Sequence, residues 1–283
     1  MVTVTGHQGV PLHVTTYGDQ DKPAILLIHG WSQHSSCWDA LCETLSDRYY
    51  LVAPDLRGHG ASGKPEDPAA YDSSAPWAGD VHAMIDQLGL DHPILVGWSM
   101  GGWVVQDYVM LHGAEAISGL VLIGTSLTTG DKLPPETAAL RRDGIRAPDM
   151  YLDDQRANVA ATLGFTRACF AKDPGADVIA RTVGTSMLVP PAIRWACRMR
   201  SVDYRPTTKA CNRPIWLVWG SEDQAAVPPM RDEAIQTLPD AQVTLYDGLG
   251  HTPFVEDTPA FARDLDAFAT RAFAALPSTR QAS

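Results

Sequence analysis

The sequence lacks a long hydrophobic run. Its longest apolar stretches, such as PILVG and GLVLIG, are far shorter than the roughly 18 residues that a helix needs to cross a bilayer. The first ten residues, MVTVTGHQGV, contain no basic segment followed by an apolar one, so they do not resemble a secretory signal. These absences predict a cytoplasmic protein that spans no membrane.

Positive charge is also scarce. The 283 residues include 22 lysines and arginines against 33 aspartates and glutamates, which gives a formal net charge of −11. Proteins that bind DNA, RNA or anionic lipid surfaces need basic side chains to neutralise phosphates. We therefore expect neither nucleic acid nor membrane as a partner, and an acidic, solubilising surface is a sufficient explanation of the charge.

Metal-binding and disulfide patterns are missing as well. The cysteines are odd in number, form no Cys-x-x-Cys pair and are interpreted as reduced, mostly buried thiols: Cys37, Cys42, Cys169, Cys197 and Cys211. No His-Glu-x-x-His or similar ligand spacing occurs. Residues 58–65 nearly match a phosphate-binding loop, but Pro65 stands where serine or threonine should bind Mg²⁺. We predict no metal and no cofactor.

What the sequence does contain is an alternation of buried strands and helices. Continuous apolar runs predict strands that are covered on both faces, and stretches of helical periodicity follow them. The predicted strands are 12–18, 24–30, 50–56, 94–99, 117–125, 214–220 and 242–248, and the predicted helices are 35–46, 76–88, 100–112, 229–237 and 259–275. This order predicts βαβ units and a mainly parallel sheet, an α/β fold.

The alternation stops between residues 127 and 208. This segment is rich in proline and contains no convincing buried strand. We interpret it as helices and loops inserted into an α/β core that is formed by residues 1–126 and 209–276. Residues 277–283 are expected to be a disordered tail.

A serine lies at the change from one strand to a helix, in the stretch VGWSMGG. Gly97, Ser99 and Gly101 match G-x-S-x-G, a turn so tight that the serine backbone is strained and its hydroxyl is lifted above the sheet edge. A Cβ at either glycine would clash, because these residues crowd one another. The N–H groups that follow begin a helix, whose positive end favours a developing anion. We predict that Ser99 is a nucleophile; the alternative is a serine that only caps the helix.

A serine nucleophile needs a base that is oriented by a third group. His251 lies in a loop after the last predicted strand, and from the carboxyl end of a parallel strand it can meet Ser99 above the sheet. His29 also ends a strand, but we expect its ring to shape a loop by hydrogen bonding. An incidental loop histidine is the alternative for His251.

The acid that orients the base is predicted to be Asp223. It directly follows the strand at 214–220, again at the carboxyl edge, whereas the side chain of Glu222 would point elsewhere. A helix-capping role is the alternative for Asp223. The chain order Ser99, Asp223, His251 is the order of one hydrolase superfamily.

These residues resemble the α/β-hydrolase fold over essentially the full chain. The stretches that match are LLIHGWSQHSSCW, VAPDLRGHGAS, VGWSMGG, WLVWGSEDQAAVP and DGLGHTPFVEDTP. PAIRWACRMRSVDYRP is similar, more loosely, to a segment of bacterial arylesterases and cofactor-free haloperoxidases (perhydrolases), and GWS resembles carboxylesterases that act on pimeloyl methyl esters. The resemblance implies a mostly parallel central sheet flanked by helices, with residues 127–208 as a helical cap.

The resemblance also implies an oxyanion hole made by the backbone N–H groups of Trp31 and Met100. Preformed backbone donors of this kind stabilise a tetrahedral oxyanion by about 3 kcal/mol each. Their side chains remain free to line the acyl pocket. We expect Trp31 and Trp98 to contact substrate there; the alternative is that Trp98 packs beneath the helix.

These expectations combine into a metal-free serine hydrolase that forms an acyl-enzyme. A small or medium, mostly apolar carboxylic ester fits best, because no charged clamp is obvious around the site. The same triad could instead cleave a lactone, an amide or a carbon–carbon bond, or pass the acyl group to another acceptor, as a perhydrolase does. A non-catalytic receptor of the same fold is a further alternative. The sequence leaves the oligomeric state open, a homo-oligomer included.

Overall fold

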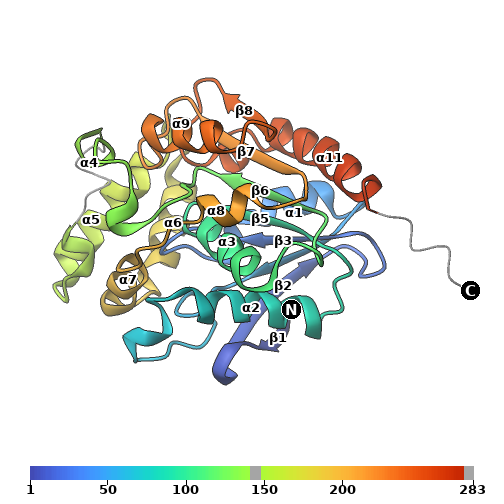
Figure 1. Cartoon of the computed structure of the whole chain (residues 1–283). Coiled ribbons are helices and arrows are strands. Elements are labelled where there is room, and N and C mark those ends of the chain that lie inside the picture. Colours follow the sequence, from blue (N-terminus) through green and yellow to red (C-terminus); the bar gives the residue numbers. More distant parts are fainter. Residues whose placement is uncertain (141–147, 277–283) are drawn as a thin grey trace, which may run out of the picture.

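An eight-stranded sheet forms the centre of the computed structural model, which describes residues 1–140 and 148–276 (Figure 1). The strands are β1 (Val2–Thr5), β2 (Pro11–Tyr17), β3 (Ala24–Ile28), β4 (Tyr50–Pro54), β5 (Ile94–Trp98), β6 (Gly119–Ile123), β7 (Ile215–Gly220) and β8 (Gln242–Tyr246). Their order in the sheet is β1-β2-β4-β3-β5-β6-β7-β8. All pairs from β4 to β8 are parallel, which confirms the predicted mostly parallel α/β sheet.

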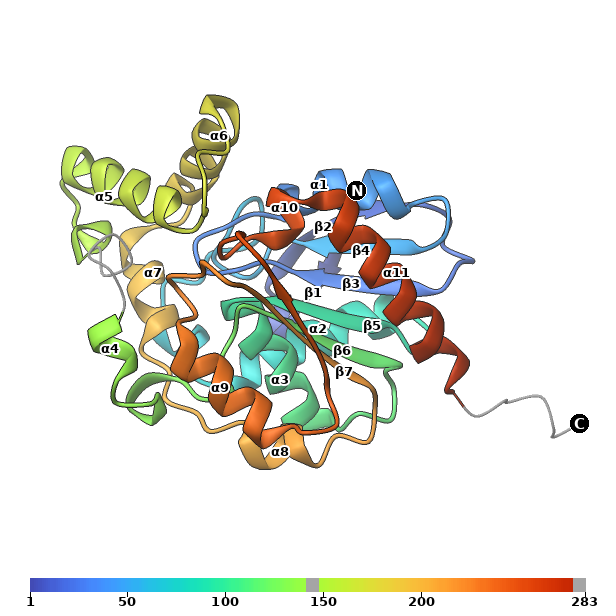
Figure 2. The same ribbon diagram turned by 90° about the horizontal axis from the view of Figure 1, so that it is seen from above.

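Helices cover both faces of this sheet (Figure 2). They are α1 (Asp39–Leu45), α2 (Ser74–Gln87), α3 (Met100–His112), α4 (Thr137–Leu140), α5 (Gln155–Ala168), α6 (Ala176–Met187), α7 (Pro191–Arg198), α8 (Arg205–Lys209), α9 (Pro228–Thr237), α10 (Pro253–Glu256) and α11 (Thr258–Ala274). Helices α2, α3 and α9 pack on one face, and α1, α10 and α11 pack on the other. Each helix that the sequence predicts is present, within a few residues.

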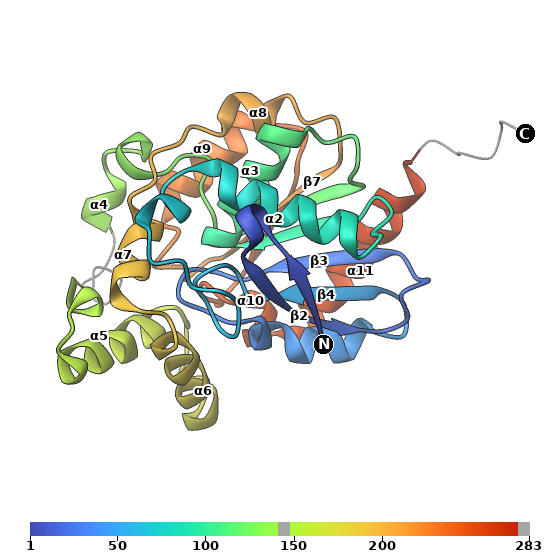
Figure 3. The ribbon, with the colours of Figure 1, turned by 90° about the horizontal axis from the view of Figure 1, so that it is seen from below.

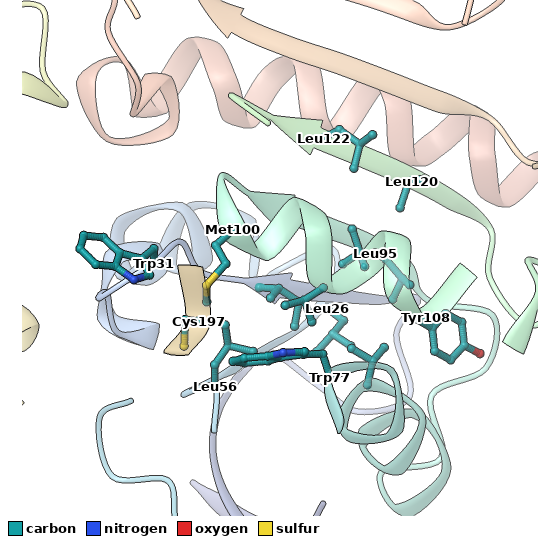
Figure 4. Packing of buried hydrophobic residues seen from close by; sticks show 14 of the residues in the cluster. Leu26, Trp31, Leu56, Trp77, Leu95, Met100, Tyr108, Leu120, Leu122 and Cys197 are labelled. Carbon is teal, nitrogen blue, oxygen red and sulfur yellow. The ribbon is translucent and has the colours of Figure 1, made fainter. Parts of the chain in front are cut away.

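The central strands are buried because both of their faces are covered. In β3, Leu26 and Ile28 face the core layer with α2 and α3, whereas Ile25 and Leu27 face the layer with α1 and α11. Burial of each such side chain contributes about 1.5–3 kcal/mol. Figure 4 shows the layer between the sheet and helices α2 and α3, with Trp31 at one end and Tyr108 at the other. This rigid sheet fixes the loops that follow its strands.

One strand, β1, was not predicted from the sequence. β1 pairs antiparallel with β2 at the edge of the sheet nearest the N-terminus (Figure 3). Only Val4 of this strand is buried, so the sequence offered no continuous apolar run there. This strand extends the sheet beyond β2, at the edge opposite to β8.

The segment 127–208 is helical where the structure describes it. It contains α4 to α8, and its only described β contact is an isolated bridge between Thr128 and Asp203. Helices α5 and α6 pack together and project beyond the sheet, with α7 between them and the core (Figure 2). α8 packs beside α3, where the Thr208 hydroxyl donates to Gln106 Oε1 over 3.0 Å. The expected tail, 277–283, lies outside the described residues.

Candidate active site

Ser99 stands between β5 and α3 in a strained turn. Its φ of 54° and ψ of −118° lie outside the regions that side-chain-bearing residues normally adopt, at a cost of about 1–3 kcal/mol. The Ser99 N–H donates to the carbonyl of Ile123 over 2.8 Å, which ties the turn to β6. A Cβ on Gly97 would lie 2.4 Å from the Gly101 oxygen, and one on Gly101 would lie 2.3 Å from the Ile28 oxygen. Only glycine fits at both positions.

His251 and Asp223 meet at the carboxyl edge of the sheet. His251 Nδ1 lies 2.8 Å from Asp223 Oδ2, and both residues are buried. The other carboxylate oxygen accepts the N–H groups of Ala225 and Ala226, each over 2.8 Å. The carboxylate therefore has one oxygen fixed by backbone and the other turned to the imidazole, an arrangement that places the proton on Nδ1 and leaves Nε2 as the basic atom.

The histidine loop is held from two sides. The His251 N–H donates to the carbonyl of Cys169 over 2.8 Å, and the His251 carbonyl accepts the indole N–H of Trp98 over 2.8 Å. Cys169 follows α5 of the inserted segment, and Trp98 immediately precedes the serine. His251 is thus anchored both to the insert and to the strand that precedes Ser99.

A cavity of about 220 Å³ brings these groups together. Ser99 and His251 both line it, and the partly exposed serine faces the same space as the buried histidine. Much of the remaining wall is apolar and comes from Trp31, Met100, Trp103, Leu133, Phe165 and Met230. The volume is just below the range of about 300–1,000 Å³ that is typical of ligand sites. It favours a small substrate.

Gly124 is a site residue that the sequence analysis missed. It follows β6, has a φ of 51° and lines the cavity. A Cβ there would lie 2.8 Å from His251 Nδ1 and 3.0 Å from Asp223 Oδ2, so any side chain would intrude on that pair. The sequence did offer a signal for Gly124, because it is a glycine directly after a buried strand. That strand, β6, lies between β5, which precedes Ser99, and β7, which precedes Asp223.

The expected oxyanion donors lie beside Ser99. Met100 is the first residue of α3, where a backbone N–H has no acceptor within its own helix. A Cβ on Gly30 would lie 3.3 Å from the Ser99 Cβ, so the Gly30–Trp31 peptide lies against the serine. Trp31 and Met100 both line the cavity. Two preorganised N–H groups in this position could stabilise an oxyanion.

Two buried histidines shape the loop of Trp31. His29 Nε2 accepts the Leu56 N–H over 3.0 Å and its Nδ1 donates to the Gly30 carbonyl, as expected for a structural role. His59, which the sequence analysis passed over, accepts the Ser32 N–H over 3.2 Å. Burial lowers the pKa of His29 to about 4 and that of His59 to about 3, so both rings are neutral at pH 7.

Trp98 does not line this cavity, contrary to the expectation that it contacts substrate there. Its ring lies 5.6 Å from that of His251 and 5.2 Å from that of Phe254, within the layer of α10 and α11. The strand period is the reason, because residues 94, 96 and 98 of β5 point to the same buried face. The alternative, packing beneath the helix that follows Ser99, does not describe its position either, because α3 packs on the opposite face of the sheet.

The wall of the cavity also includes a positively charged side chain that the sequence analysis did not expect. Arg198, at the end of α7, lines the cavity and stacks over the Trp31 ring. All five cysteines are free, and the described residues contain no group of three or more His, Cys, Asp or Glu side chains that could hold a metal ion. None of the described helices is both long and apolar enough to cross a membrane.

Comparisons with known proteins agree with this architecture. The profile of the alpha/beta hydrolase family matches residues 25–264. The chain is 30% identical over 261 residues to a pimeloyl-[acyl-carrier protein] methyl ester esterase of Aromatoleum aromaticum, which covers 87% of this chain and 98% of that protein. It is 27% identical to a non-heme haloperoxidase of Rhodococcus erythropolis, with 89% and 93% covered.

A solved structure gives the same result. The esterase RhEst1 from Rhodococcus sp. ECU1013 superposes with a TM-score of 0.87 at 30% identity, over 95% of this chain and 98% of that one. The family match at residues 25–264 includes the parallel part of the sheet and the loops that hold Ser99, Asp223 and His251. The chain therefore belongs to the alpha/beta hydrolase family and is an enzyme of the hydrolase class.

Proposed function

We propose that this enzyme hydrolyses small to medium carboxylic esters through a serine acyl-enzyme. The observation that carries the proposal is the shared cavity, in which the strained Ser99 and the His251–Asp223 pair converge. In the proposed reaction, His251 Nε2 removes the proton of the Ser99 hydroxyl as its oxygen attacks the ester carbonyl. The N–H groups of Trp31 and Met100 stabilise the oxyanion.

The second half of the reaction uses the same groups. His251 returns its proton to the departing alcohol, and the acyl-enzyme forms on Ser99. Water then enters, gives a proton to His251 and attacks the acyl carbonyl. As the acid leaves, His251 returns that proton to the serine oxygen, which restores the hydroxyl. Asp223 stays ionised and stabilises the imidazolium in both steps.

The mostly apolar cavity supports an acyl or alcohol group of modest size. The relatives include esterases and a protein named 3-oxoadipate enol-lactonase 2, so a lactone is the alternative substrate for the same machinery. Acyl transfer to hydrogen peroxide is a further alternative, consistent with the non-heme haloperoxidase relative.

A covalent probe and a substrate panel test the proposal. A fluorophosphonate should label the folded wild-type enzyme, and Ser99→Ala should abolish labelling. p-Nitrophenyl esters of increasing acyl length should show a preference for short chains, and lactones and peracid formation should be measured in parallel. Absence of labelling in folded wild-type protein would contradict the serine mechanism and would favour a non-catalytic receptor.

A further inference from the structure

Arg198 is the one lysine or arginine among the described residues that line the cavity. It is the last residue of α7, and its guanidinium carbon lies 5.3 Å from the centre of the Trp31 ring. No aspartate or glutamate is among the described residues of that wall. The chain has a net charge of −11, so a general excess of basic residues does not explain a cation here.

The support beneath Arg198 is rigid. The indole N–H of Trp31 donates to the carbonyl of Arg194 over 2.9 Å, and Phe165 packs edge-on against the Trp31 ring at 5.3 Å. The ring is buried, so it presents a fixed face to the guanidinium. Stacking of this kind orients a guanidinium and leaves its N–H edge available for a planar anion.

Arg198 also differs from the other arginines that the fold uses. Arg57 pairs with Asp80, and Arg200 pairs with Asp107, in both cases with both side chains buried. For Arg198, the described residues supply the neutral phenol of Tyr151 as a hydrogen-bond partner and no carboxylate within ion-pair distance. A cation with an apolar support, a neutral partner and a place in the substrate cavity is suited to a ligand anion.

We propose that Arg198 binds a carboxylate of the substrate, so that the enzyme prefers esters with a free carboxylate over neutral esters of the same shape. Short dicarboxylic acid monoesters belong to this class. The inference rests on the proposed ester hydrolysis at Ser99 and adds the second polar group that the substrate must have. It also explains why Arg198 lies in a wall whose other described residues are mostly apolar.

Two matched pairs of esters test the preference. Monomethyl glutarate and methyl pentanoate differ only by a carboxylate in place of a methyl group on the acyl side; carboxymethyl butanoate and ethyl butanoate make the same comparison on the alcohol side. In at least one pair, Arg198→Gln should reduce kcat/KM for the anionic ester about tenfold, chiefly through KM, and should change the neutral ester by less than about twofold.

The control is Arg181→Gln, which removes the same charge from the exposed surface of α6, away from the cavity wall. It should leave both preferences unchanged, and Arg198→Lys should retain part of the preference because it keeps the charge without the planar fork. An equal effect of Arg198→Gln on the anionic and neutral esters of both pairs would overturn the proposal.

A binding measurement separates this proposal from the proposed reaction. Calorimetry with glutarate should show binding to the wild type and to Arg181→Gln, and about tenfold weaker binding to Arg198→Gln. If the wild type bound glutarate through Arg198 but cleaved no ester, the proposed function would fail while the anion site stood. Equal glutarate binding, or none, in the wild type and Arg198→Gln would overturn the anion site itself.

Discussion

The hydroxyl of Ser186 in α6 donates a hydrogen bond to the carbonyl of Ser32 over 2.7 Å. Ser32 follows Trp31 in the loop after β3 and has a φ of 57°. Gln33 Nε2 donates to the same Ser186 hydroxyl over 3.3 Å, and Arg194 donates to the Ser186 carbonyl. The inserted helices thus hold the loop that supplies one proposed oxyanion donor.

Ser186→Ala is expected to loosen that loop. The substitution removes both hydrogen bonds of this hydroxyl and leaves the Ser32 carbonyl without that donor, at a cost of about 1–3 kcal/mol in unfolding free energy. If the Trp31 N–H is misplaced, it stabilises the oxyanion of the transition state less well. We therefore expect kcat for a p-nitrophenyl ester to fall several-fold while KM changes little. Thr185→Ala is the control, because that hydroxyl bonds within its own helix. Equal kcat values in the two variants would contradict the coupling.

Gly124→Ala should disable the enzyme although Ser99 itself is unchanged. The added methyl group would lie within 3.0 Å of both His251 and Asp223, and the residue would be strained at its positive φ. We expect kcat to fall by at least about tenfold and stability by about 1–3 kcal/mol, measured by ester hydrolysis and urea unfolding.

A second glycine provides the comparison. Gly184 lies inside α6, and a Cβ there meets no atom within 4 Å. Gly184→Ala should leave kcat unchanged and stabilise the protein by about 0.5–1 kcal/mol, because alanine loses less conformational freedom in a helix. Wild-type activity in Gly124→Ala would show that the His251–Asp223 pair tolerates displacement.

Asp223→Asn should keep the fold and remove most of the activity. An asparagine that donates to His251 Nδ1 would favour the tautomer with its proton on Nε2, which cannot accept the serine proton. In a Ser-His-Asp enzyme studied elsewhere, this substitution lowers kcat about 10⁴-fold, and we expect a loss of at least about 10²-fold here. Glu222→Gln, at the exposed neighbouring position, should retain wild-type kcat. A fully active Asp223→Asn would leave the histidine without a proposed orienting group.

The two neutral histidines under the Trp31 loop predict acid sensitivity. Their pKa values fall from 6.5 to about 4 for His29 and about 3 for His59 on burial, so between these values and 6.5 the unfolded chain binds more protons than the folded one. Unfolding free energy should therefore fall as the pH drops from about 6.5 to about 4, by at most about 1.4 kcal/mol per pH unit for each histidine.

Urea unfolding between about pH 7 and pH 4.5 measures this slope. His59→Gln keeps an acceptor for the Ser32 N–H but does not titrate, so its slope should be smaller than that of the wild type. Identical slopes for wild type and His59→Gln would refute a protonation cost at this residue.

The sequence alone determined those features that depend on neighbours along the chain. The continuous apolar runs identified the parallel strands. A strand that is buried on both faces has apolar side chains at successive positions, and not an alternation of apolar and polar ones. The turn at Ser99 was local in part, since a Cβ on Gly97 would meet Gly101 four residues later, whereas a Cβ on Gly101 would meet Ile28 of β3. Asp223 and His251 were proposed because both follow strands, and parallel strands bring their carboxyl ends to one edge.

The tertiary structure decided what depends on residues distant in sequence. Gly124 matters through His251 and Asp223, and His59 matters through Ser32. Arg198 is near the serine only because the inserted helices fold back over the sheet edge, and its position on Trp31 joins residues 167 positions apart. The sequence shows which residues have chemistry to offer, but the packing of the insert determines which of them face the cavity, since side chains far apart in sequence meet only through the folded core.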